Sequence, residues 1–173
     1  MKLEFSPVKL LLVYVFPFAM AMAAFLDLLT MKLPNRFVIA FAALFFPASL
    51  AVGMPLEQIG MHVAAGAAML AVAFLLFIPG WIGGGDAKFF AAASLWLGWG
   101  TLLEYALFAG ILGGFLTLAI IGARSIPLPV FLVRQEWAYR LHHPETGIPY
   151  GIAMAFAGLL VFSSSPWAAA IGM

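Results

Sequence analysis

Long apolar segments, separated by short polar or glycine-rich stretches, make up almost the whole chain. Charged residues, Gly and Pro divide these apolar residues into six candidate helices. Each is close to the roughly 20 residues that an α-helix needs to cross a hydrocarbon core of about 30 Å. We therefore predict about six transmembrane helices, over 7–26, 35–52, 60–79, 87–103, 105–122 and 149–171.

The fourth and fifth candidate helices are the least clearly separated, because only GWGTLLEY lies between their apolar parts. Five transmembrane helices with one re-entrant segment are therefore the alternative to six. The first segment has the position of a signal peptide, but its apolar run is long and no small-residue cleavage site follows it. We expect it to be a retained helix. The polar stretch at 123–148 is expected to contain one short helix in the membrane interface.

Composition agrees with this pattern. The 173 residues are 65% hydrophobic and 9% charged, with a mean hydropathy of +1.11, whereas soluble domains carry roughly 25% charged residues. We predict an all-α polytopic membrane protein in which residues 1–173 form a single transmembrane domain. The net charge of +1 gives no reason to expect a nucleic-acid partner. The absence of cysteine excludes disulfides, a thiol nucleophile and a cysteine-rich zinc domain.

The positive residues predict how the helices are oriented, because Lys and Arg in short loops stay on the cytoplasmic side. Lys2 and Lys9 precede or begin the first helix. The other positive residues all fall on the opposite side: Lys32, Arg36, Lys88, Arg124, Arg134 and Arg140. We therefore predict that the N-terminus lies outside. The loops after the first, third and fifth helices then face the cytoplasm.

Only two of the seven acidic residues are aspartates, Asp27 at the end of the first helix and Asp86 at the start of the fourth. The orientation, derived from positive residues alone, places both at the cytoplasmic boundary. Ionisable groups at membrane depth are costly and are usually functional. Two carboxyls within a few ångströms cannot both ionise, so one can accept a proton while the other donates one. Such a pair can hydrolyse a peptide bond without metal, Ser or Cys.

The segment GGGDAK places three glycines directly before Asp86. We expect Gly83 to Gly85 to adopt backbone angles closed to other residues and to leave room for an extended substrate. Lys88 is placed to tune the aspartate pair or to meet a substrate carboxylate. Simpler structural roles stay open: Asp86 as a helix N-cap, Asp27 as a partner of Lys32, Pro34 as a helix stop and Asn35 as the cap of the second helix.

Three motifs together resemble the type IV prepilin peptidase family of G-x-G-D aspartyl proteases. They are DLLTMKLPN from Asp27, GGGDAK from Gly83 and IPYGIA ending at Ala153, in the order and spacing of that family. The resemblance implies that Asp27 and Asp86 are the catalytic aspartates and that Gly83 and Gly85 are the motif glycines. It also matches accompanying positions at Lys88, Pro34, Asn35, Pro149, Tyr150 and Gly151.

What the resemblance implies is removal of the short basic leader from prepilins and pseudopilins at the cytoplasmic face of a bacterial inner membrane, without a metal or cofactor. The implied partners are these substrates, the lipid bilayer and pilus or secretion assembly machinery. Longer members insert a cytoplasmic segment, often with cysteines, between the first two helices and also methylate the pilin. Here about eight residues separate those helices. We expect an aspartic endopeptidase without N-methyltransferase activity, like the short Flp-type members.

Two other classes of function remain as alternatives. A small proton-coupled transporter or channel would use Asp27 and Asp86 to carry protons, but it favours ionisable groups near the midplane and repeated halves. The sequence shows no repeat, and both aspartates fall at one face. A structural assembly subunit would leave the aspartates unexplained. His142 and His143 lack a carboxylate at ligand spacing, so we do not expect a metal site there.

Overall fold

Helices make up most of the chain. A computed structural model describes residues 7–170, and within this range it contains no strand. The prediction of an all-α fold is therefore confirmed. The helices are α1 (Pro7–Thr30), α2 (Asn35–Ala51), α3 (Leu56–Phe77), α4 (Gly84–Leu97), α5 (Trp99–Arg124), α6 (Val130–Val133), α7 (Glu136–His142), α8 (Tyr150–Phe162) and α9 (Pro166–Ala170).

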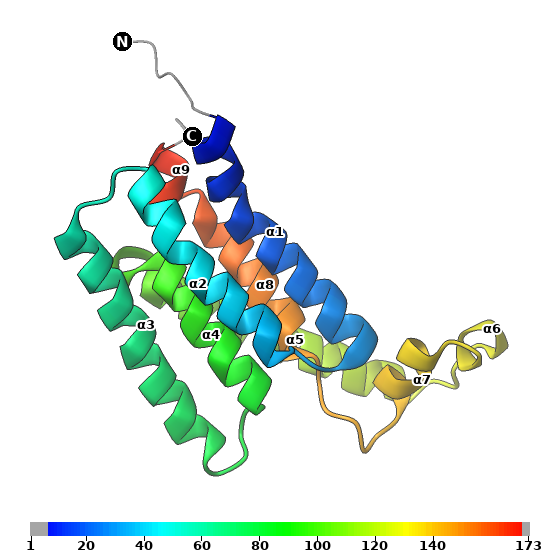
Figure 1. Cartoon of the computed structure of the whole chain (residues 1–173). Coiled ribbons are helices and arrows are strands. Elements are labelled where there is room, and N and C mark those ends of the chain that lie inside the picture. Colours follow the sequence, from blue (N-terminus) through cyan, green and yellow to red (C-terminus); the bar gives the residue numbers. More distant parts are fainter. Residues whose placement is uncertain (1–6, 171–173) are drawn as a thin grey trace.

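Six of the described helices run alternately up and down, and α4 and α8 lie at their centre (Figure 1). Helix α8 packs on α1, α5 and α4, while α4 also packs on α3, α2 and α5. Both central helices are rich in Ala and Gly, whose small side chains let neighbouring helices approach closely. Both are also short, with 14 residues in α4 and 13 in α8.

Aromatic side chains fill the upper part of the bundle. Trp96 is fully buried near the end of α4, and its ring stacks on Phe41 of α2 with the ring centroids 5.4 Å apart. Its indole N–H donates to the Phe41 carbonyl at 2.9 Å. The indole N–H of Trp167 in turn donates to the Trp96 carbonyl. These buried polar groups are therefore satisfied, and they tie α2, α4 and α9 together.

Two helices, α3 and α5, are long and apolar enough to cross a membrane. Most of each helix is exposed, whereas a helix in the core of a soluble protein would be mostly buried. Shorter apolar helices are α2, α8 and residues 14–30 of α1. These exposed apolar surfaces are those of a membrane protein. The six-span arrangement stays a prediction.

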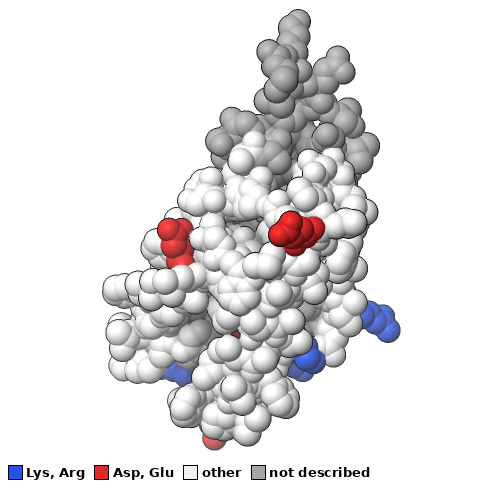
Figure 2. Space-filling model, turned by 90° about the vertical axis from the view of Figure 1, so that its left-hand side faces the viewer, with Lys and Arg blue, Asp and Glu red and all other residues white. Residues whose placement is uncertain are grey.

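Six of the eight Lys and Arg residues gather at one end of the bundle. The connections 31–34, 78–83 and 125–149 all lie at the lower end in Figure 1. On the face drawn in Figure 2, the visible Lys and Arg side chains lie in the lower half. All six positive residues assigned to the cytoplasmic side belong to these connections or to the helix ends beside them. Lys2 lies outside the described residues. The side of the membrane on which this end lies stays a prediction.

Several helix boundaries differ from those expected, and the fifth helix begins at Trp99 instead of residue 105. The fourth helix ends at Leu97, not near residue 103, because Gly98 adopts a φ of +69° that breaks the chain direction. The expected helix over 149–171, whose last residue lies outside the described range, is interrupted between α8 and α9. The expected interfacial helix within 123–148 is two short helices, α6 and α7.

Gly98 provides a test of this packing. Its φ of +69° and ψ of −179° lie in a region that is essentially restricted to glycine, and an added Cβ would lie 2.7 Å from the His62 ring. We expect Gly98→Ala to reduce the free energy of unfolding by at least about 2 kcal/mol. Gly100→Ala is the control, because open space surrounds that position. Equal midpoints for the two variants in thermal unfolding would contradict this account.

Candidate active site

Four chain segments enclose a cavity of about 720 Å³ at the lower end of the bundle. The end of α1 contributes Asp27, the α1–α2 turn contributes residues 31–35, and the glycine-rich connection leading into α4 contributes residues 80–86. Residues around Ile148, just before α8, complete the lining. The cavity therefore brings together the three motifs, which are far apart in the sequence.

Asp27 is buried, with 4% of its surface exposed. Its Oδ2 atom accepts a hydrogen bond from the backbone N–H of Gly151 at 2.7 Å. Gly151 is the second residue of α8, where unpaired N–H groups and the helix dipole favour a negative charge. Glycine at position 151 leaves the carboxyl in this place, because an added Cβ would lie 2.7 Å from the same oxygen and would displace it. Asp27 is thus held by α8 and is not paired with Lys32.

Asp86 is half-buried at the third position of α4. The N-cap residue is Gly83, and no side chain caps the helix, so the interpretation of Asp86 as an N-cap is wrong. An added Cβ at Gly83 would lie 3.0 Å from Oδ2 of Asp86, so the glycine makes room for the carboxyl. The Cβ of a residue at position 85 would make only ordinary contact with Leu33.

The glycines Gly83 to Gly85 do not adopt the backbone angles closed to other residues that were expected of them. Gly84 and Gly85 are helical, and Gly83 has an ordinary φ of −70°. The backbone angle closed to other residues occurs earlier in the connection, at Gly80 with a φ of +79°. The sequence pattern could not assign that role, because any of the nearby glycines can end a helix.

The carboxyls of Asp27 and Asp86 line the same cavity. A donated N–H stabilises the ionised form of a carboxyl, and this donor reaches Asp27. Burial disfavours the charge of both carboxyls, and Asp27 is the one of the two with a backbone donor that favours its ionised form. Two negative charges in this cavity are therefore unfavourable. Such a pair can take a proton from water and give another to a leaving group.

Three of the accompanying motif residues line this cavity, namely Pro34, Asn35 and Tyr150, whereas Lys88, Pro149 and Gly151 do not. Pro34 is the N-cap residue of α2, and Asn35 does not cap that helix, contrary to expectation. The Asn35 side-chain oxygen instead accepts a hydrogen bond from Lys88 at 3.0 Å. Pro149 is fully buried. Tyr150 reaches α5, where its hydroxyl lies 3.0 Å from that of Thr117.

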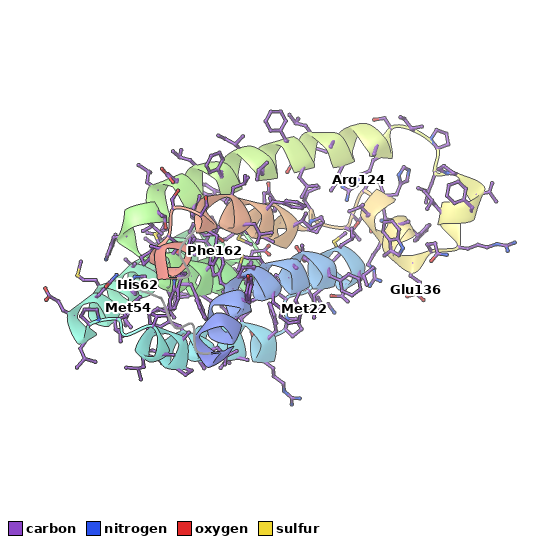
Figure 3. The ribbon with its side chains drawn as sticks, turned by 90° about the horizontal axis from the view of Figure 1, so that it is seen from above. Met22, Met54, His62, Arg124, Glu136 and Phe162 are labelled. Carbon is purple, nitrogen blue, oxygen red and sulfur yellow. The ribbon has the colours of Figure 1, made fainter. Side chains whose placement is uncertain are left out.

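The segment leading to Gly151 is held by hydrogen bonds from two arginines. The motifs did not identify either of them. Arg124 donates to the carbonyls of Leu141 and Thr146 at 3.0 and 2.9 Å. Arg140 donates to the carbonyl of Leu29 near the end of α1 at 3.1 Å. Figure 3 shows Arg124 on the side of the bundle that carries α6 and α7. Their position in a polar loop was visible in the sequence, but their distant partners were not.

Among residues 7–170, no group of three His, Cys, Asp or Glu side chains is arranged to hold a metal ion. His142 and His143 lie at the end of α7 and just after it. The carboxyl groups that line the aspartate cavity are those of Asp27 and Asp86, and Lys32, Asn35 and Tyr150 also line it.

Comparison with known proteins gives one match. A family model described as the type IV leader peptidase family matches residues 14–118. This range contains Asp27, the α1–α2 turn and GGGDAK, but not Gly151. No curated protein and no solved structure matches the chain. Because the family model covers more than half of the 173 residues, the chain belongs to the type IV leader peptidase family, whose members are proteases.

Proposed function

We propose that this protein removes the leader from type IV prepilins and pseudopilins by means of the Asp27 and Asp86 pair. Membership of the family supports a leader peptidase function in general. The observation that carries the specific proposal is the shared cavity, in which a buried carboxyl held by the N-terminus of α8 lies close to a second carboxyl. No cofactor is part of the proposal.

The chemistry follows from the different surroundings of the two groups. Asp27, which accepts the Gly151 N–H, is the carboxylate that takes a proton from water as the water oxygen attacks the scissile carbonyl carbon. Asp86 in its protonated form donates to the carbonyl oxygen. When the tetrahedral intermediate collapses, the carbon–nitrogen bond breaks and the amine nitrogen receives the proton held by Asp27. The proton on the former carbonyl oxygen returns to Asp86.

The substrate has to be unwound where it is cut, because helical backbone shields its carbonyl groups. The cavity lining supports this requirement, since two connections without regular helix, 31–34 and 78–83, border it. The short basic leader that the family resemblance implies would lie at the end of the bundle where the polar connections gather. We propose that this end faces the cytoplasm of a bacterial cell, with the bundle in its inner membrane.

We further propose that the protein does not methylate its product. Only residues 31–34 connect α1 to α2, which is even less than the separation expected from the sequence. A connection of four residues offers no binding site for a methyl donor. In the polar stretch between α5 and α8, Arg124 holds residues 141–147, and Arg140 donates to the end of α1.

A cleavage assay tests the proposed function. Purified protein in detergent is mixed with an Flp-type prepilin, and the product is followed by gel shift and by mass spectrometry. We expect cleavage just before the apolar segment of the prepilin. If intact, monodisperse protein cleaves none of several prepilins, the proposal fails, and proton flux in liposomes becomes the next measurement because it tests the transporter alternative.

A substitution of Arg124 tests whether the segment before α8 has to be held in place for activity. Removing its charged hydrogen bonds loosens residues 141–147, which lead to the helix end that holds Asp27. Hydrogen bonds of charged groups contribute about 1.5–3 kcal/mol, so we expect Arg124→Gln to lower kcat by roughly tenfold or more. Arg124→Lys should recover little of it, since Lys lacks the planar fork. Arg134→Gln is the control, and an equal loss there would refute the assignment.

A further inference from the structure

A second cavity, of about 520 Å³, lies between α2 and α3 with α4 as its floor. Both outer helices pack on α4, but they make few contacts with each other, so a groove remains between them. Its walls are apolar, with Val38 and Phe46 on one side and Leu70 on the other. The only polar residues that line it are Asn35 and Lys88.

The groove adjoins the aspartate cavity at one end. Asn35 lines both cavities, and its side chain accepts the hydrogen bond from Lys88 at the polar end of the groove. Lys88 follows Asp86 by two residues on α4. Any molecule that fills the groove along its length therefore ends beside the two carboxyls.

The shape of the groove suits a helix. On α2 its lining extends from Asn35 to Phe46, a helical rise of about 16 Å, which is roughly half of the hydrocarbon thickness. The remaining positions include Ala42, Ala67 and Ala91. Small side chains of this kind allow close approach of a second helix within a membrane.

We propose that this groove receives the apolar helix of the prepilin substrate. A helix seated there, with its N-terminal end at Asn35, places the peptide bond that precedes it in the cavity of Asp27 and Asp86. The inference rests on the proposed function and adds to it the surface that selects the substrate. Because the groove binds the part of the substrate that does not react, its loss should raise KM more than it lowers kcat.

Tryptophan substitutions test the groove, and the chain offers matched controls on the same helices. Ala42→Trp and Ala67→Trp fill the groove, whereas Ala43 and Ala64 are exposed and do not line it. We expect each groove variant to raise KM for full-length prepilin about tenfold or more, with kcat within about threefold of wild type. The variants Ala43→Trp and Ala64→Trp should keep KM within about twofold.

A cross-linking measurement gives a second readout that does not require an active variant. The protein contains no cysteine, so Ala67→Cys and Ala64→Cys can each be made in an Asp86→Asn background that retains uncleaved substrate. With a single cysteine in the prepilin's apolar helix, we expect a disulfide cross-link at position 67 and little at position 64. Equal cross-linking at both positions would overturn the proposal.

The outcomes separate this inference from the proposed function. If the wild type does not cleave prepilin, the proposed function is wrong. Wild-type cleavage, with groove variants whose KM matches that of the controls, overturns the groove assignment alone and leaves the groove as a site for lipid chains. A raised KM in the groove variants together with selective cross-linking at position 67 establishes the docking surface.

Discussion

Asp86→Asn is expected to lower kcat for prepilin cleavage by at least about 1000-fold, and Asp27→Asn to do the same. Asn keeps the shape of the side chain but can neither take a proton from water nor release one to the leaving amine. Because both carboxyls act in one reaction, the double variant should be no slower than the worse single variant. Gel-shift cleavage with a long incubation, supported by mass spectrometry, measures the residual rate.

The controls for these variants lie at the opposite end of the bundle. Glu57 is in the first turn of α3 and Glu104 is in the first half of α5, and neither lines the aspartate cavity. Glu57→Gln and Glu104→Gln should cleave at the wild-type rate. If either Asp-to-Asn variant retains more than about a tenth of the wild-type kcat, the two-carboxyl mechanism is wrong.

Gly151→Ala should have the second largest effect, a loss of about 100-fold in kcat. The new methyl group would lie 2.7 Å from Oδ2 of Asp27 and 3.0 Å from its Cβ and Cγ atoms. The carboxyl therefore has to move, and the hydrogen bond that it accepts from the backbone at position 151 is lost or lengthened. A displaced carboxylate is poorly positioned to activate water, because misplacement of about 1 Å can cost 100-fold in rate.

Gly110→Ala is the matched control for Gly151→Ala, since nothing lies within 4 Å of a Cβ added at position 110 in α5. Both variants should unfold near the wild-type temperature, because Asp27 can shift toward the cavity to relieve the contact. Wild-type kcat in Gly151→Ala would show that the contact with α8 does not position Asp27.

The pattern of apolar segments predicted the helical fold, and together with the positive residues it placed both aspartates at one end of the bundle. The three motifs predicted the family. The family model confirms the family. These predictions succeed because membrane helices are specified by local composition and the motifs are short and continuous. They required no knowledge of how the helices pack.

Contacts between distant residues could not be predicted in this way. The hydrogen bond from Gly151 to Asp27 joins residues 124 positions apart, and the residues that accept hydrogen bonds from Arg124 lie in another segment. Local ambiguity caused the error at the fourth helix, because both Gly98 and Gly100 are able to interrupt it. The structure separates them: Gly98 has a positive φ, whereas Gly100 lies inside α5.

The short central helix α4 has a consequence for a substrate helix that spans the membrane beside it. Its 14 residues rise about 21 Å, against a hydrocarbon core of about 30 Å. A substrate helix long enough to span that core and lying beside α4 exceeds it by roughly 9 Å. In a substrate helix that is level with the end of α4 at Leu97, this overhang of about six residues would extend past the start of α4 toward the aspartate cavity. The mismatch in length itself would then expose the end of the substrate helix to water and favour its unwinding.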